Sequence, residues 1–219
     1  MIKNVYIKGR QEIADEYNVL CKTYKGNDKS LKTYDYKKAC KKFEIGMDKI
    51  EDNASILDIG CGTGNLIKYL KETIQFNEKN YTGIDFSQEM VNYCKIKYPQ
   101  SSFLKGDLLE SDRKSEYYLE LYDKYDYVVC LSAFQQKPKY IDQQIYIYEN
   151  IKLFFSLLKK GGRVVFDIFS DKFVDYIDDN LIYLNPEQVL SFCFKLSYSI
   201  KLDSSISPYE VVFSVNNVE

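Results

Sequence analysis

The sequence predicts an α/β protein built on a mostly parallel sheet of seven strands, with helices on both faces and an antiparallel hairpin at its C-terminal end. Two observations carry this prediction. Short apolar segments alternate with stretches of helical apolar spacing, which is the pattern of a parallel sheet covered on both faces. After Pro186 a short helix is expected, and then two strand-like segments follow one another across a turn rich in serine and proline, as in a hairpin.

The elements follow in order along the chain. Residues 1–53 carry two segments of helical apolar spacing, 11–24 and 33–50, and are expected to form an N-terminal helical lid. The core spans residues 54–219. Its expected strands are short, apolar and bounded by turn residues: 54–59, 81–85, 102–104, 125–131, 163–169, 196–202 and 209–216.

Helices are expected between these strands. They cover 64–75, the segment from a Ser87 cap to Tyr98, and 141–158. The last of these should bury a face containing Ile145 and Ile151 and end at Gly161-Gly162. Residues 170–185 fit no element. They follow the fifth strand, where ligand-binding loops of open α/β sheets lie, and are expected to form a substrate-side insertion within the core.

Composition narrows the function classes. The 219-residue chain has no His and six scattered Cys, so a Ser-His-Asp triad, a Cys-His dyad and a His-bearing zinc site are excluded. The cysteines form no Cys-x-x-Cys pair, which favours free thiols in a reducing cytosol and no metal site. No apolar stretch approaches the ~20 residues that span a bilayer, and residues 1–11 lack a signal-peptide core, so we expect a cytoplasmic protein without a membrane partner. A net charge of −2, with the basic excess confined to residues 1–50, does not favour a nucleic-acid partner.

The most informative segment is the glycine-rich turn after the first expected strand. Glycines there allow a sharp turn and a close approach of the backbone to a ligand. A dinucleotide fingerprint requires Gly-x-Gly-x-x-Gly, but Asn65 stands at the position of its last glycine. Asp58, just before the turn, suits a cationic ligand better than a pyrophosphate. A ligand that joins an α-amino group to a nucleoside, such as S-adenosylmethionine, fits both features.

Acidic residues follow the next two expected strands. Asp85 ends the second strand, where a carboxylate can accept hydrogen bonds from both ribose hydroxyls. NAD-binding proteins share this feature, so it indicates a ribose rather than one particular ligand. Asp107 follows the third strand and can accept a hydrogen bond from an adenine amino group. The fourth strand leads into Ser132-Ala133-Phe134 at the mouth of the same expected crevice.

Taken together, these segments resemble class I S-adenosylmethionine-dependent methyltransferases of the small Rossmann-like type, often called methyltransferase type 11 or type 25. The resemblance covers about residues 54–169, and the hairpin by topology. Residues 13–17 are similar to an N-terminal helix that closes over the cofactor in relatives. The resemblance implies that the following residues bind the cofactor: Asp58, Gly60, Cys61, Gly62, Gly64, Asp85, Phe86, Met90, Gly106, Asp107, Leu108, Cys130 and Leu131.

The resemblance implies methyl transfer from S-adenosylmethionine to a nitrogen or oxygen atom of a small-molecule acceptor, with S-adenosylhomocysteine as product and no metal. Candidate catalytic residues are Gln135 at the exit of the fourth strand, Asp167 in the fifth strand, and Tyr17. Asp171 is a further candidate base, and Asp167 is equally well explained as a structural carboxylate.

Four alternatives differ in ligand or in activity. An RNA (tRNA)-modifying methyltransferase and a catalytically silent adenosylmethionine-binding subunit of a partner both stay open. An aminopropyltransferase would share the fold but require an acidic polyamine pocket, which the sequence does not show. An NAD-dependent oxidoreductase is disfavoured by Asn65 and Asp58.

Overall fold

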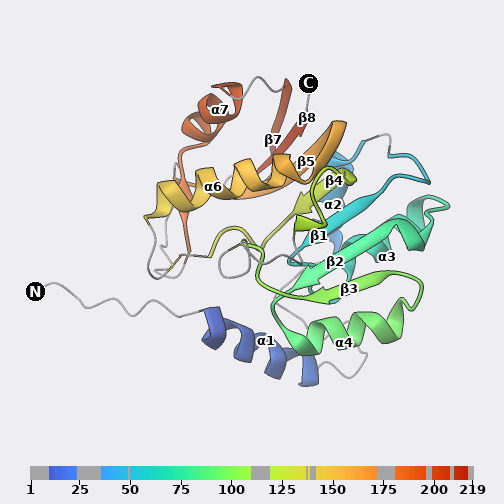
Figure 1. Ribbon diagram of the computed structural model, residues 1–219. Coiled ribbons are helices and arrows are strands. Elements are labelled where there is room, and N and C mark those ends of the chain that lie inside the picture. The colour runs from blue at the N-terminus through green and yellow to red at the C-terminus, as the bar shows by residue number, and fades with distance from the viewer. Residues whose placement is uncertain are drawn as a thin grey trace, which may run out of the picture.

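The computed structural model describes residues 10–23, 36–48, 50–109, 119–136, 138, 142–171, 181–195, 199–207 and 210–216. They form one sheet with helices on both faces, and its main path runs β3-β2-β1-β4-β5-β8-β7 (Figure 1). The short strand β6 pairs with β5 beside this path. The predicted α/β class and the seven-stranded path are thus confirmed. The strands are β1 (Ile56–Ile59), β2 (Tyr81–Asp85), β3 (Ser102–Lys105), β4 (Tyr125–Cys130), β5 (Leu158–Ser170), β6 (Tyr183–Leu184), β7 (Ser199–Ser207) and β8 (Glu210–Asn216).

The directions of the strands bring several strand ends together at one edge of the sheet. The pairs β3–β2, β2–β1, β1–β4 and β4–β5 are all parallel, so the carboxyl ends of these five strands lie together. β8 is antiparallel to both β5 and β7, which confirms the predicted C-terminal hairpin. Ligands of open parallel sheets bind at the carboxyl edge, because the connecting loops begin there.

Two apolar clusters, one on each face, hold the helices to the sheet. Alternate residues of β5 point to opposite faces: Phe166 joins the cluster that contains α6 and α7, and Val165 joins the cluster that contains α2, α3 and α4. This division confirms helices on both faces. The helices are α1 (Arg10–Thr23), α2 (Tyr36–Gly46), α3 (Asn65–Thr73), η1 (Glu78–Asn80, a 3₁₀ turn), α4 (Gln88–Lys97), α6 (Gln143–Ser156) and α7 (Pro186–Lys195). None of the helices in these described ranges is long and apolar enough to cross a membrane.

Two predicted details around α6 are wrong. Ile145 is 57% exposed, although Ile151 of the same predicted face is buried, as are Tyr146 and Ile147. The helix is apolar on more than one side, so its spacing alone misplaced one margin of the buried face. The following strand was expected at residue 163 but begins at Leu158, because a register shift in the β4–β5 pairing carries the extended backbone through Gly161-Gly162.

Candidate functional site

The turn after β1 is left-handed at three glycines. Gly60, Gly62 and Gly64 have φ values of 76°, 53° and 79°, a region that glycine enters without steric cost. The turn is tied to β2, because the amides of Gly60 and Cys61 donate to the carbonyl oxygen of Ile84 at 2.8 and 3.1 Å. A Cβ atom at position 62 would have no neighbour within 4 Å among the described residues. At Gly62 the turn therefore presents bare backbone to open space at the carboxyl edge, whereas a Cβ atom on Gly60 or Gly64 would meet Ala133 or Tyr98.

Asp85 joins this turn to the tip of β2. One carboxylate oxygen accepts a hydrogen bond from the amide of Gly62 at 2.9 Å, and the other accepts one from the amide of Ser87 at 2.8 Å. These two hydrogen bonds fix the Asp85 carboxylate at the tip of β2, beside the glycine turn, which is the place that the ribose prediction gives it.

Asp58 is buried one strand away, at the end of β1. The hydroxyl of Tyr81 donates to its Oδ2 at 2.5 Å. Burial, aided by the charge of Asp85 and opposed by the Tyr81 hydrogen bond, raises the pKa of Asp58 to about 7. A cation beside a buried carboxyl group favours its ionised form, because the opposite charge offsets the cost of burial. The Asp58 carboxylate can therefore pair with an α-ammonium group once it has lost its proton.

Tyr81 was not predicted as a site residue. It opens β2 as an ordinary aromatic strand residue, and only the parallel register, which sets Ile56 beside Tyr81, brings its hydroxyl to Asp58.

The exits of β3 and β4 complete this edge. The amide of Gly106 donates to the backbone oxygen of Asp85 at 3.0 Å, and Asp107 follows as a mostly buried acid. The side chains of Leu108 and Cys130 belong to the apolar cluster beneath α6 and α7, so only their backbone can contact a ligand at this edge. The structure thus gathers the predicted cofactor-binding residues at or just after the ends of four neighbouring strands, β3, β2, β1 and β4, except Met90, which is buried in the first turn of α4. Their contact with a cofactor stays a prediction.

The thiol of Cys61 is not a nucleophile. Its hydrogen bond with Cys94, together with burial, raises its pKa well above the usual range for a cysteine. Such a thiol stays protonated at neutral pH and serves as packing.

Helix α1 lies against the start of α4, next to this edge (Figure 1). Tyr17 packs edge-on against Phe86, with ring centroids 5.8 Å apart. The side-chain oxygen of Asn18 accepts hydrogen bonds from the Ser87 hydroxyl at 2.7 Å and from the Glu89 amide at 3.2 Å. Asn18 was not among the predicted site residues, and its position one residue after Tyr17 is the sole sequence clue. These contacts place α1 beside Asp85 and Phe86.

The catalytic candidates lie in three different places. Tyr17 is on α1, beside Phe86. Gln135 is only 5% exposed and follows β4, and its Nε2 has no hydrogen-bond partner among the described residues. Asp167 is fully buried in β5 and forms an ion pair with Lys42. Of the three, Gln135 alone combines burial with an unused hydrogen-bond donor.

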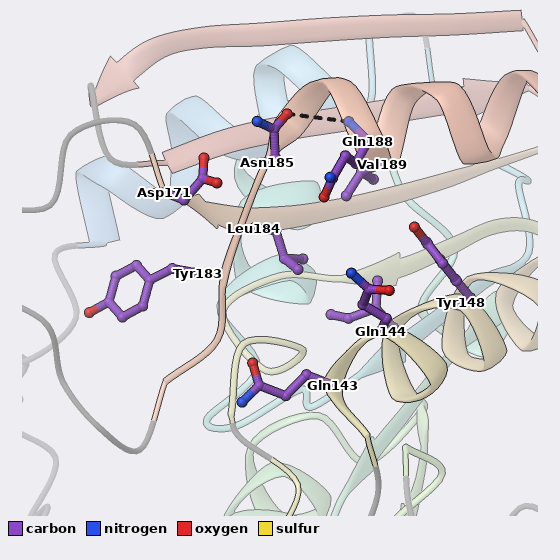
Figure 2. A pocket seen from close by; sticks show the side chains of 10 residues that line it. Gln143, Gln144, Tyr148, Asp171, Tyr183, Leu184, Asn185, Gln188 and Val189 are labelled. Carbon is purple, nitrogen blue, oxygen red and sulfur yellow. Dashed lines mark hydrogen bonds between the residues drawn. The ribbon is translucent and has the colours of Figure 1, made fainter.

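A pocket opens beside the carboxyl end of β5. Figure 2 shows side chains from the start of α6 facing others from β6 and the start of α7. Asp171, Tyr183 and Asn185 on this wall come from or directly follow the predicted 170–185 insertion, of which residues 172–180 lie outside the described ranges. The pocket is mostly polar in its lining: Gln143, Gln144, Ile147, Tyr148, Asp171, Tyr183, Leu184, Asn185, Gln188 and Val189. Within the described residues, no three His, Cys, Asp or Glu side chains are grouped as metal ligands.

The fold and the edge site define a Rossmann-like protein with a nucleoside-binding arrangement. A family model described as a methyltransferase domain matches residues 50–197, and the chain belongs to this family of class I S-adenosylmethionine-dependent methyltransferases.

Its relatives include enzymes named for different acceptors. Malonyl-[acyl-carrier protein] O-methyltransferase 1 of Ilyobacter polytropus is 27% identical over 183 residues, covering 80% of this chain and 60% of that protein. Magnesium protoporphyrin IX methyltransferase of Synechocystis, solved with bound S-adenosylmethionine, aligns with a TM-score of 0.63 at 16% identity over 98% of this chain and 100% of that one. Phosphoethanolamine N-methyltransferase 2 of Haemonchus contortus aligns with a TM-score of 0.65 at 14% identity over 96% of this chain and 59% of that one. These two structures show the shared fold. This chain spans 60% of the length of the Ilyobacter enzyme and of a Geobacillus methyltransferase.

Proposed function

We propose that this protein transfers the methyl group of S-adenosylmethionine to a nitrogen or oxygen atom of a small-molecule acceptor. Family membership supports the reaction type. The observation that carries the proposal is the meeting of Asp58, the glycine turn and Asp85 at the adjoining ends of β1 and β2. These groups match a ligand that carries an ammonium group at one end and a ribose at the other.

Each acidic residue has its own part in holding the cofactor. Asp85, held at the tip of β2 by the amides of Gly62 and Ser87, accepts hydrogen bonds from the ribose hydroxyls. Asp107 accepts one from the adenine amino group, and Asp58 pairs with the α-ammonium group. When bound, S-adenosylmethionine supplies an already activated methyl group on its sulfonium. The remaining task of the chain is to align the acceptor and to exclude water.

The acceptor side is proposed to lie along β4, β5 and the 170–185 insertion. The polar pocket beside the end of β5 supports this assignment, because it lies at the edge where parallel strands present their ligands. Gln135 connects the two regions: its backbone oxygen accepts a hydrogen bond from the amide of Ile182 at 2.7 Å, and its side-chain Nε2 has no hydrogen-bond partner among the described residues. Gln135 is therefore proposed to bind a polar group of the acceptor.

Calorimetry on the whole chain tests the cofactor. We expect binding of S-adenosylmethionine and S-adenosylhomocysteine, weaker binding of decarboxylated S-adenosylmethionine, and no binding of NAD. Preference for NAD would overturn the proposal.

A second assay tests the acceptor class by following S-adenosylhomocysteine release with amines, alcohols, carboxylic acids and tRNA. Turnover with one of the small molecules supports the proposal. Turnover with tRNA alone would replace it with the RNA-modifying alternative, and cofactor binding without any turnover would favour the silent subunit.

A further inference from the structure

A cluster of buried charges links α2 to the end of β5. Lys42, from α2, is 1% exposed and forms an ion pair with Asp167, which is fully buried in β5. The same ammonium group lies 3.3 Å from a carboxylate oxygen of Glu210 in β8, and Lys38 lies 2.9 Å from that oxygen. Burying charges costs much free energy, and apolar side chains often fill such a place with equal or greater stability. Stability alone therefore gives little reason for this cluster.

The cluster connects to the backbone of the turn after β4. The amide of Ser132 donates to Asp167 Oδ1 at 2.8 Å, and the Lys42 ammonium group donates to the Ser132 hydroxyl at 2.9 Å. Ser132 has a φ of 58°, a left-handed conformation that residues other than glycine seldom adopt. Such a conformation persists only where its surroundings hold it. Lys42 and Asp167 contact Ser132 at its hydroxyl and its amide, and both contacts come from buried charged side chains.

This turn lies on the side of the site away from the nucleoside. In the strand order β3-β2-β1-β4, the two acidic residues proposed to bind adenosine lie at the ends of β3 and β2. Asp58, which is proposed to bind the α-ammonium group, lies on the next strand, β1. The turn after β4 comes next in this order. It also touches the glycine turn, because a Cβ atom on Gly60 would lie 2.3 Å from the Cβ of Ala133. A shift of Ser132-Ala133 would therefore disturb the methionine half of the cofactor site before the nucleoside half.

We propose that Lys42 and Asp167 are positioning residues that hold the Ser132-Ala133 turn in the shape that binds the methionine half of the cofactor. The inference rests on the proposed cofactor site. It also gives α2 a functional role, since α2 supplies Lys42 from outside the strand edge. If the turn relaxes, only a fraction of the protein molecules can bind the cofactor. The apparent dissociation constant for the cofactor then rises by the inverse of that fraction.

The test compares two ligands on the same variants. S-adenosylhomocysteine has both halves of the cofactor, whereas 5′-methylthioadenosine lacks the amino-acid half. The double variant Lys42→Met/Asp167→Leu replaces the ion pair with apolar side chains and is expected to stay folded. Calorimetry should show at least about a tenfold loss of affinity for S-adenosylhomocysteine and less than about a twofold change for 5′-methylthioadenosine.

Two further variants separate positioning from plain stability. Asp167→Asn keeps an oxygen that can accept from the Ser132 amide, so it should bind S-adenosylhomocysteine within about threefold of the wild type despite a lower melting temperature. Arg163→Met is the matched control. It removes the 2.7 Å ion pair between Arg163 in β5 and Asp48, which lies just after α2. This pair lies at the opposite edge of the sheet from the carboxyl ends of the parallel strands. The control variant should lower the melting temperature and leave both affinities unchanged.

The outcomes are distinct. If the wild type does not bind S-adenosylhomocysteine, the proposed function itself fails, and this inference fails with it. If the wild type binds and the double variant binds equally well, the positioning role alone is wrong. An equal loss of both ligands in the double variant would also overturn it, because that result indicates general damage to the fold.

Discussion

Asp58 makes folding stability and cofactor affinity oppose one another, and replacing it with asparagine tests this directly. Burial raises the pKa of Asp58 from 3.8 to about 7. Each pKa unit corresponds to about 1.4 kcal/mol, so the ionised carboxylate costs the folded state about 4 kcal/mol relative to the unfolded chain. Asparagine has nearly the same shape, can still accept the hydrogen bond from Tyr81, and never ionises. The Asp58→Asn variant should therefore be the more stable protein at pH 8.

The sign follows from proton binding. The folded protein holds a proton on Asp58 more tightly than the unfolded chain, so the contribution of Asp58 to stability falls as the pH rises from about 4 to about 7 and is constant above. From these two pKa values, the advantage of the variant should grow by roughly 2–3 kcal/mol between pH 5 and pH 8. Urea denaturation of both proteins at the two pH values measures this difference.

Cofactor affinity should change in the opposite direction. The variant loses the charged partner of the α-ammonium group, and a hydrogen bond to a charged group contributes about 1.5–3 kcal/mol, so affinity for S-adenosylhomocysteine should fall about 10- to 150-fold at pH 8. In the wild type, ligand binding must ionise Asp58, so affinity should be about tenfold weaker at pH 6 than at pH 8. The reasoning is refuted if the two proteins show the same pH dependence of stability, or if the variant keeps wild-type affinity.

Three other perturbations test the remaining parts of the site. Asp85→Ala leaves both ribose hydroxyls without their acceptor and should weaken S-adenosylmethionine binding about 10- to 150-fold by calorimetry, and unchanged affinity would remove the ribose assignment. Gly62→Val places a branched side chain in the open space beside the turn, at a φ of 53°. It should abolish cofactor binding while circular dichroism shows an intact sheet. A folded variant that still binds would contradict the role of the turn. Deleting residues 1–24 removes α1 with its contacts to Phe86 and Ser87, and should leave a folded sheet with weaker cofactor retention and no methyl transfer. Normal activity of the truncated protein would show that α1 is not a lid.

The interior of the site shows where sequence patterns stop being informative. Tyr81 and Lys42 sit in segments whose spacing reads as an ordinary strand and an ordinary helix. Their partners, Asp58 and Asp167, lie 23 and 125 residues away along the chain. Such pairs form because the strand register and the docking of α2 bring distant segments together, and neither is encoded locally. Lys42 is the clearest case, because a lysine in the middle of a lysine-rich helix is usually a solvent-facing residue.

The sequence by itself determined the α/β class, a mostly parallel sheet with an antiparallel hairpin, and the order of the glycine turn and acidic residues along successive strands. These features are local: alternating apolar segments specify the elements, and parallel strands necessarily present their ends at one edge. The tertiary structure alone decided which side of α6 is buried, that α1 lies against Phe86 and Ser87, and that Asp167 is enclosed by Lys42 and the Ser132 amide. Those outcomes depend on which surfaces meet when the layers pack, since burial and charge pairing are properties of the assembled fold and not of any one segment.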